Sequence, residues 1–158
     1  MSMLRALQVQ IAQRLQAADC FNGPNVTDVI AYDAADAMNR LQVALAKRQR
    51  GVIVGTPSLS RQTATGAAKS CTADLAISCW ELPATNRSPD DYDNPFTALD
   101  MAEAVWALLD GWTPPDGGWS QVLVNRLAMV GTENDQMMVV QYVVSAQTST
   151  LVSITQDT

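Results

Sequence analysis

One stretch of the sequence, residues 71–81, restricts the fold more than any other. From Cys71 to Cys79 every second residue is apolar, and the residues between them are mostly polar or small. Side chains alternate between the two faces of a β-strand, so this period of two is typical of a strand with one face in a core. The sequence therefore predicts a fold that contains a sheet.

The preceding stretch, residues 51–70, has some features of a phosphate-binding loop. It reads GVIVGTPSLSRQTATGAAKS, an apolar run followed by a polar segment. The motif G-x-x-x-x-G-K-[ST] requires a glycine directly before the lysine, but two alanines separate Gly66 from Lys69. A strand also follows where the motif needs the N-terminus of a helix. We therefore predict a strand, a long polar loop over 58–70 and a second strand, without a nucleotide site.

Three parts of the chain have the pattern of a helix. Leu7, Ile11 and Leu15 are four residues apart, which places them on one face of a first helix. Gly51 is expected to close the second helix, and Pro95 to occupy the first position of the third, where its missing amide hydrogen is not needed. The predicted helices cover about residues 3–18, 34–49 and 95–110.

Four segments are predicted to be strands, at about residues 52–57, 71–81, 120–130 and 137–147. The segment SQVLVNRLAMV (120–130) is apolar on both faces in places, which indicates a central strand. The order of elements predicts an α+β fold, with a mostly antiparallel four-stranded sheet and helices packed on one face. The length of 158 residues is that of a single domain, 1–158.

The absence of histidine is the strongest restriction on chemistry. It excludes Ser-His-Asp and Cys-His catalysis and removes the commonest general acid and base. The aspartates at 90, 91 and 93 lack the glycine and glutamate of a calcium loop, so a solvated loop that ends in a helix cap is the favoured interpretation. Three cysteines without a C-x-x-C pair give neither a disulfide framework nor a zinc site. We predict no catalytic residues, no cofactor and no metal.

Charge and hydropathy exclude two classes of partner. Ten basic residues against sixteen acidic ones give a net charge of −6, and no basic block exists for sequence-independent binding of nucleic acid. No apolar run reaches the length of a membrane span. The N-terminal segment lacks the apolar centre of a signal peptide, so synthesis in the cytoplasm is expected.

Five segments together match the layout of a known family. They are GVIVGTP (51–57), SLSRQTATGAAKS (58–70), TADLAISCWELPA (72–84), LDMAEAVWALLDGW (99–112) and MMVVQYVVSAQ (137–147). In this order the chain resembles the tail terminator (minor tail) proteins of long-tailed bacteriophages and prophages. The resemblance covers about residues 1–148. The second helix and the segment PPDGGW depart from the family layout.

The resemblance implies a structural protein without enzymatic activity. Such proteins form rings, usually hexamers, on the end of a completed tail tube, where they stop polymerisation and present a surface to the head connector. The implied partners are other copies of the chain, a tail-tube protein and a head–tail connector protein. The implied location is the virion, after synthesis in the cytoplasm of the host bacterium.

The polar segments 58–70 and 83–94 are the predicted contact regions of such a ring, because binding residues often lie in polar loops held on a rigid sheet. Arg61 and Lys69 are expected to pair with acidic groups on a neighbouring subunit or on the tube; the alternative is that both are ordinary solvated charges. The candidate interface residues are Arg61, Gln62, Lys69, Arg87, Asp90, Asp91 and Tyr92.

Other functions are consistent with the same sequence. Within particle assembly, the chain fits a head–tail connector or neck protein, or a tail-tube subunit, which would polymerise into long stacks. From another class, a small bacterial ligand-binding or regulatory module would need convergent polar groups in a pocket, and the apolar faces contain few.

Overall fold

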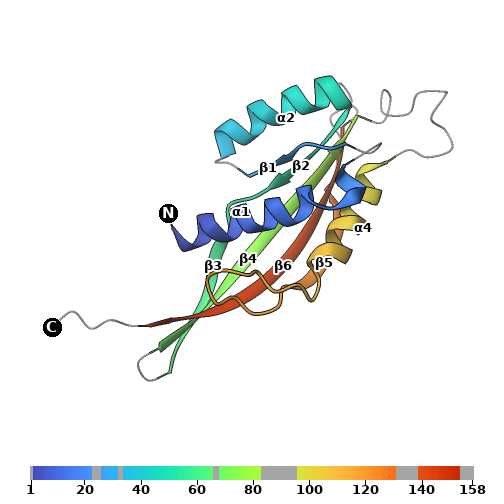
Figure 1. Cartoon of the computed structure of the whole chain (residues 1–158). Coiled ribbons are helices and arrows are strands. Elements are labelled where there is room, and N and C mark those ends of the chain that lie inside the picture. Colours follow the sequence, from blue (N-terminus) through green and yellow to red (C-terminus); the bar gives the residue numbers. More distant parts are fainter. Residues whose placement is uncertain are drawn as a thin grey trace.

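The strand predicted at 71–81 lies at the centre of the sheet in the computed structural model of the chain (Figure 1). The structure describes residues 2–22, 26–31, 34–65, 68–82, 96–130 and 139–153. The helices are α1 (Met3–Gln16), η1 (Asp19–Phe21, a 3-10 helix), α2 (Ala34–Arg48) and α4 (Ala98–Leu109). The strands are β1 (Val29–Ile30), β2 (Arg50–Val54), β3 (Ser58–Thr65), β4 (Ala68–Glu81), β5 (Leu123–Val130) and β6 (Val140–Ser153).

The sheet confirms the predicted α+β class and its mostly antiparallel pairing. The strand order is β1-β2-β4-β6-β5, and β3 pairs with β4 beyond the end of β2. Among the described strands only the pair β1–β2 is parallel. The sheet has six strands rather than four. The four predicted strands do not include β1, where only a short extended piece at about 26–32 is expected, or β3, which is too polar to show an apolar face.

The main core lies between one face of the sheet and the helices α1 and α4. Leu7, Ile11 and Leu15 of α1 are fully buried there, together with the alternate residues of β4 from Ala73 to Cys79. The apolar face of helix α1 and the apolar face of strand β4 therefore pack together in one layer. Figure 1 shows α1 and α4 crossing this side of the sheet.

The helix α2 forms a second, smaller layer on the opposite face, so helices cover both faces at this end of the sheet. Leu41 and Leu45 of α2 pack with Ile53, whereas the neighbouring Val52 belongs to the main core. Gly51 lies within β2 instead of closing α2. A Cβ at Gly51 would lie 3.0 Å from Leu41 Cδ1, so this glycine permits α2 to approach the strand closely.

The predicted loop over 58–70 was wrong, because most of this segment is a two-stranded antiparallel hairpin. β3 pairs with β4 from Ser58 opposite Asp74 to Thr65 opposite Ala68. The Ser- and Thr-rich sequence conceals the strand, because β-branched threonine favours strands while polar side chains remove the alternation that marks a buried face. Residues 66 and 67 lie outside the described residues.

The ends of several elements differ from the sequence prediction. α4 begins at Ala98 rather than Pro95, because Thr97 is its N-cap and forms a reciprocal capping box with Asp100. α1 ends at Gln16 and α2 at Arg48, close to the predicted ends. β2 ends at Val54, three residues early, whereas β6 continues six residues beyond the predicted end to Ser153.

Candidate interaction surfaces

The long strands β4 and β6 extend beyond the other strands and form a projecting arm together with β3. The arm comprises residues 58–65, 68–74 and 147–153. β4 and β6 pair without interruption from Glu81 opposite Val140 to Ala68 opposite Ser153. At about 3.3 Å per residue such strands are roughly 45 Å long. Figure 1 shows their far ends and the hairpin projecting past α1 and α4, toward the side where the C-terminus lies.

The base of the arm is held by the segment between α4 and β5. Thr148 Oγ1 donates to the Ser120 carbonyl at 2.7 Å, and Thr150 Oγ1 donates to the Gly117 carbonyl at 2.9 Å. Ser120 also donates its backbone N–H to the Ser149 carbonyl at 2.7 Å. Both threonines are buried, so these bonds satisfy polar groups that burial would otherwise leave unpaired. These bonds attach the base of the arm to the segment between α4 and β5.

Three of the predicted interface residues lie on this arm, in strands rather than in a loop. The Cα register places Arg61 opposite Thr72, Gln62 opposite Cys71, and Lys69 opposite Ala64. The structure therefore brings these three positions together in one hairpin. The other four predicted residues, Arg87, Asp90, Asp91 and Tyr92, lie outside the described residues.

The face of β4 and β6 that points away from α1 is mainly polar within the arm. β4 contributes Thr72 and Asp74, and β6 contributes Gln147 and Ser149, whereas Leu151 is 69% exposed on the same face nearer the end of the arm. Gln147 Nε2 donates to Asp74 Oδ1 at 2.7 Å, and the hydroxyls of Thr72 and Ser149 are 3.2 Å apart. This cross-strand bonding gives a solvent-facing sheet surface of low charge, unlike the apolar face below α1.

The strand β5 forms one edge of the sheet, which corrects the prediction of a central strand. Within the described part of the chain, β5 pairs only with β6. Three of its apolar side chains are exposed, with relative exposures of 59% for Leu123, 59% for Met129 and 42% for Val130, whereas Val124 and Leu127 pack against the main core. Residues 110–112 bond the start of this edge, because Val124 donates its backbone N–H to Asp110 Oδ1 at 3.1 Å and Val122 bonds with the backbone of Gly111 and Trp112. The two-sided apolar pattern that suggested a central strand therefore belongs to an edge strand.

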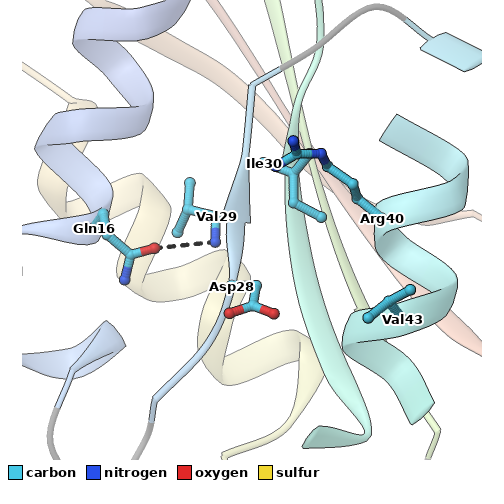
Figure 2. Close-up of a pocket in the computed structure, with 6 residues that line it drawn as sticks. All are labelled: Gln16, Asp28, Val29, Ile30, Arg40 and Val43. Atoms are coloured by element: carbon cyan, nitrogen blue, oxygen red, sulfur yellow. Dashed lines mark hydrogen bonds between the residues drawn. The ribbon is translucent and has the colours of Figure 1, made fainter. Parts of the chain in front are cut away.

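The opposite edge is the short strand β1, which lies between two hollows. Figure 2 shows the residues that line the hollow beside α2. The hollow beside α1 has a volume of about 300 Å³, and its walls include Val9, Ala12 and Val29. The hollow beside α2 has a volume of about 360 Å³, and its walls include Ile30 and Val43. Gln16 and Val29 line both hollows, and the two hollows beside β1 are together called the β1 groove hereafter.

Polar groups of the β1 groove are paired within the subunit. Gln16 Oε1 accepts the backbone N–H of Val29 at 3.1 Å, as Figure 2 shows. Asp28 Oδ1 lies 3.6 Å from Arg48 Nε at the side of the groove. The side-chain amide of Gln16 therefore takes the place that the backbone of another strand would occupy beside β1.

Sequence reasoning missed the β1 groove and the position of β5 at the edge of the sheet. A two-residue strand leaves no periodic signal, and the glutamine that contacts it resembles any polar residue of a surface helix. The apolar pattern of 120–130 was visible, but it does not distinguish an edge strand from a central one.

The described residues contain no arrangement suited to metal chemistry or to a membrane span. No group of three or more cysteine, aspartate or glutamate side chains within these ranges is placed to hold a metal ion. No helix in the same ranges has both the length and the apolar character that crossing a bilayer requires.

Comparison with solved structures finds a similar fold in a viral-type particle. A chain of the virion of a native gene transfer agent particle superposes with a TM-score of 0.63 and 14% sequence identity. The superposition covers 92% of this chain and 95% of the other chain. No protein-family model matches the sequence, and a search of curated proteins finds no match. The likeness therefore concerns the whole fold rather than one motif.

Proposed function

We propose that this chain is a structural subunit of a bacteriophage-like particle and acts as a tail terminator. In this role six copies form a closed ring on the end of the tail tube, stop its growth and join it to the head connector. The observation that carries the proposal is the similarity, over nearly the full length of both chains, to a component of a gene transfer agent virion.

The geometry of the subunit supports ring formation. A ring requires two different surfaces on each subunit, which meet in the same way around the circle. The sheet has two unlike edges, β1 and β5, and its β5 edge exposes large apolar side chains. Exposed apolar side chains on an edge strand favour association with another chain.

The projecting arm supports contact with a second ring or with the tube. Its hairpin carries Arg61, Gln62 and Lys69, with no acidic residue between 58 and 70. In a chain with a net charge of −6, this basic tip is suited to an acidic surface on a neighbour or on the tail-tube protein. We include Arg87, Asp90, Asp91 and Tyr92 in the proposed contact region on sequence grounds alone.

Imaging particles after disruption of the gene in the strain that encodes it tests this role. A tail terminator predicts tails of abnormal and variable length without attached heads, because nothing stops the tube. A head–tail connector predicts tails of normal length without heads, and a tube subunit predicts no tails. Complete, normal particles would contradict a role in assembly and would favour a ligand-binding or regulatory module.

A further inference from the structure

The β1 groove and β5 lie at the two opposite edges of the sheet, at the same position along the direction of the strands. Successive strand pairings connect Val29 to Val52, Cys79, Tyr142 and finally Met129. The next row runs in the same way from Ile30 of β1 to Ala128 of β5. The β1 and β5 edges are therefore separated across the width of the sheet, but they lie at the same position along the direction of the strands.

The directions of the strands permit β5 of one copy to pair with β1 of another. β1 is parallel to β2, and each following pair, β2–β4, β4–β6 and β6–β5, is antiparallel. Hence β5 runs opposite to β1. Rotation about a ring axis roughly parallel to the strands preserves these directions, so the β5 of a neighbour would meet β1 in the antiparallel sense.

From these relations we propose that the β1 groove binds the β5 edge of a second copy of this chain, and that this contact closes the proposed ring. The proposal rests on the ring-forming function and names the two surfaces that meet. Alternate side chains of a strand point to opposite faces. Met129 would enter the hollow beside α1, which Val9 and Ala12 line, and Val130 would enter the hollow beside α2, which Val43 lines.

The backbone at the β1 edge suits this pairing. The Val29 N–H points away from β2, because its acceptor is Gln16 of α1. In the assembled state a carbonyl of the neighbouring β5 replaces the Gln16 amide, as in other cases where a strand is added to a sheet edge. In the free subunit Gln16 satisfies this N–H and limits indiscriminate pairing at the edge.

The composition and length of the contact are consistent with a second copy as the occupant. The residues of β5 level with β1 are apolar, and Arg126, the only charged residue of β5, lies three residues from Met129. β1 has only two residues, and residues 110–112 of the same subunit bond the start of β5, so only the last residues of β5 enter the contact. Stable pairs bury about 800 Å² per partner, so a single contact is weak and closure of the ring supplies the rest.

Covalent trapping tests the contact directly. A Met129→Cys chain is mixed under mild oxidation with a chain carrying Val9→Cys, because Val9 lines the hollow that Met129 would enter. We expect a mixed disulfide dimer at a yield well above that of the control pair, Met129→Cys with Met38→Cys. Met38 is 46% exposed on α2 and does not line either hollow. Equal trapping by both pairs would overturn the proposal.

A second experiment tests whether the contact drives assembly. Met129→Lys and Val43→Arg each place a charge in one half of the contact, at side chains that are 59% and 53% exposed in the subunit. Each should raise the concentration for half-assembly about tenfold or more, since burying an unpaired charge costs more than 1.4 kcal/mol. Met38→Lys should leave assembly unchanged.

The outcomes separate this inference from the proposed function. Rings formed normally by Met129→Lys and Val43→Arg would refute the named contact and leave the ring-forming function intact. A wild-type chain that never associates, together with the absence of specific trapping, would contradict both.

Discussion

Polar side chains of α1 connect the helix to the backbone of distant segments. Gln8 Nε2 donates to the Val54 carbonyl at 2.8 Å. Gln10 forms two bonds with the backbone of Asp116, at 3.1 Å to its carbonyl and 2.9 Å from its N–H. Gln16 accepts the N–H of Val29. These glutamines connect α1 to β2, to the segment between α4 and β5, and to β1.

Replacement of Gln8 by leucine should destabilise the fold by about 1 to 3 kcal/mol. Both Gln8 and Val54 are buried, so the variant leaves the Val54 carbonyl without its partner and without water. Urea unfolding measures the change. The exposed Gln13→Leu on the same helix is the matched control and should change the midpoint little. Equal midpoints for the two variants would show that the buried bond contributes nothing.

The thiol of Cys79 should make stability fall at alkaline pH. Burial raises the pKa of this thiol above its ordinary value of 9.0, so the folded chain retains the proton after the unfolded chain has lost it. The stabilisation is complete below pH 9 and decreases above it. Between pH 8 and pH 10, wild type should lose about 1 to 1.5 kcal/mol more unfolding free energy than Cys79→Ala. Identical losses in the two chains would contradict this assignment.

At the scale of elements, the start of α4 depends on one threonine. Thr97 Oγ1 accepts the N–H of Asp100 at 3.2 Å, and Asp100 Oδ2 accepts the N–H of Thr97 at 2.9 Å. Thr97→Ala should therefore cost about 1 kcal/mol of stability, as at other N-caps. Thermal unfolding measures the loss, with the exposed Thr113→Ala as control. A Thr97→Ala chain as stable as the control would mean that packing alone fixes the start of this helix.

Elements with a strong period could be predicted from sequence, and the others could not. The four-residue spacing in α1 and the alternation in β4 were sufficient, because each places a continuous apolar face in the core. β3 was missed because its sequence lacks the alternation of apolar and polar residues that marks a strand with one buried face. The placement of α2 on the second face depends on Gly51, whose small size is informative only when the opposing Leu41 is known.

The candidate surfaces were predictable only in part. Polar composition drew attention to Arg61 and Lys69, and the structure places both on the projecting arm. The β1 groove could not be predicted, since it arises where α1, β1 and α2 approach one another from separate parts of the sequence. The edge position of β5 depends in the same way on pairings between strands that are distant in sequence.

At the scale of the whole molecule, the subunit has a sheet with two different edges. One edge presents exposed apolar side chains on β5, and the other edge has the β1 groove. Unlike surfaces of this kind produce either a closed ring or an open filament, depending on the rotation between neighbours. The proposed function requires closure, which distinguishes a terminator from a tube subunit.

Light scattering coupled to size exclusion, over a concentration series of the purified full chain, tests ring closure. We expect a monomer that converts at high concentration into one species of fixed mass, near six subunits, without further growth. The transition should be steep, because each contact is weak alone and all of them form together on closure. A mass that continues to rise with concentration, or a chain that remains monomeric throughout, would contradict ring closure.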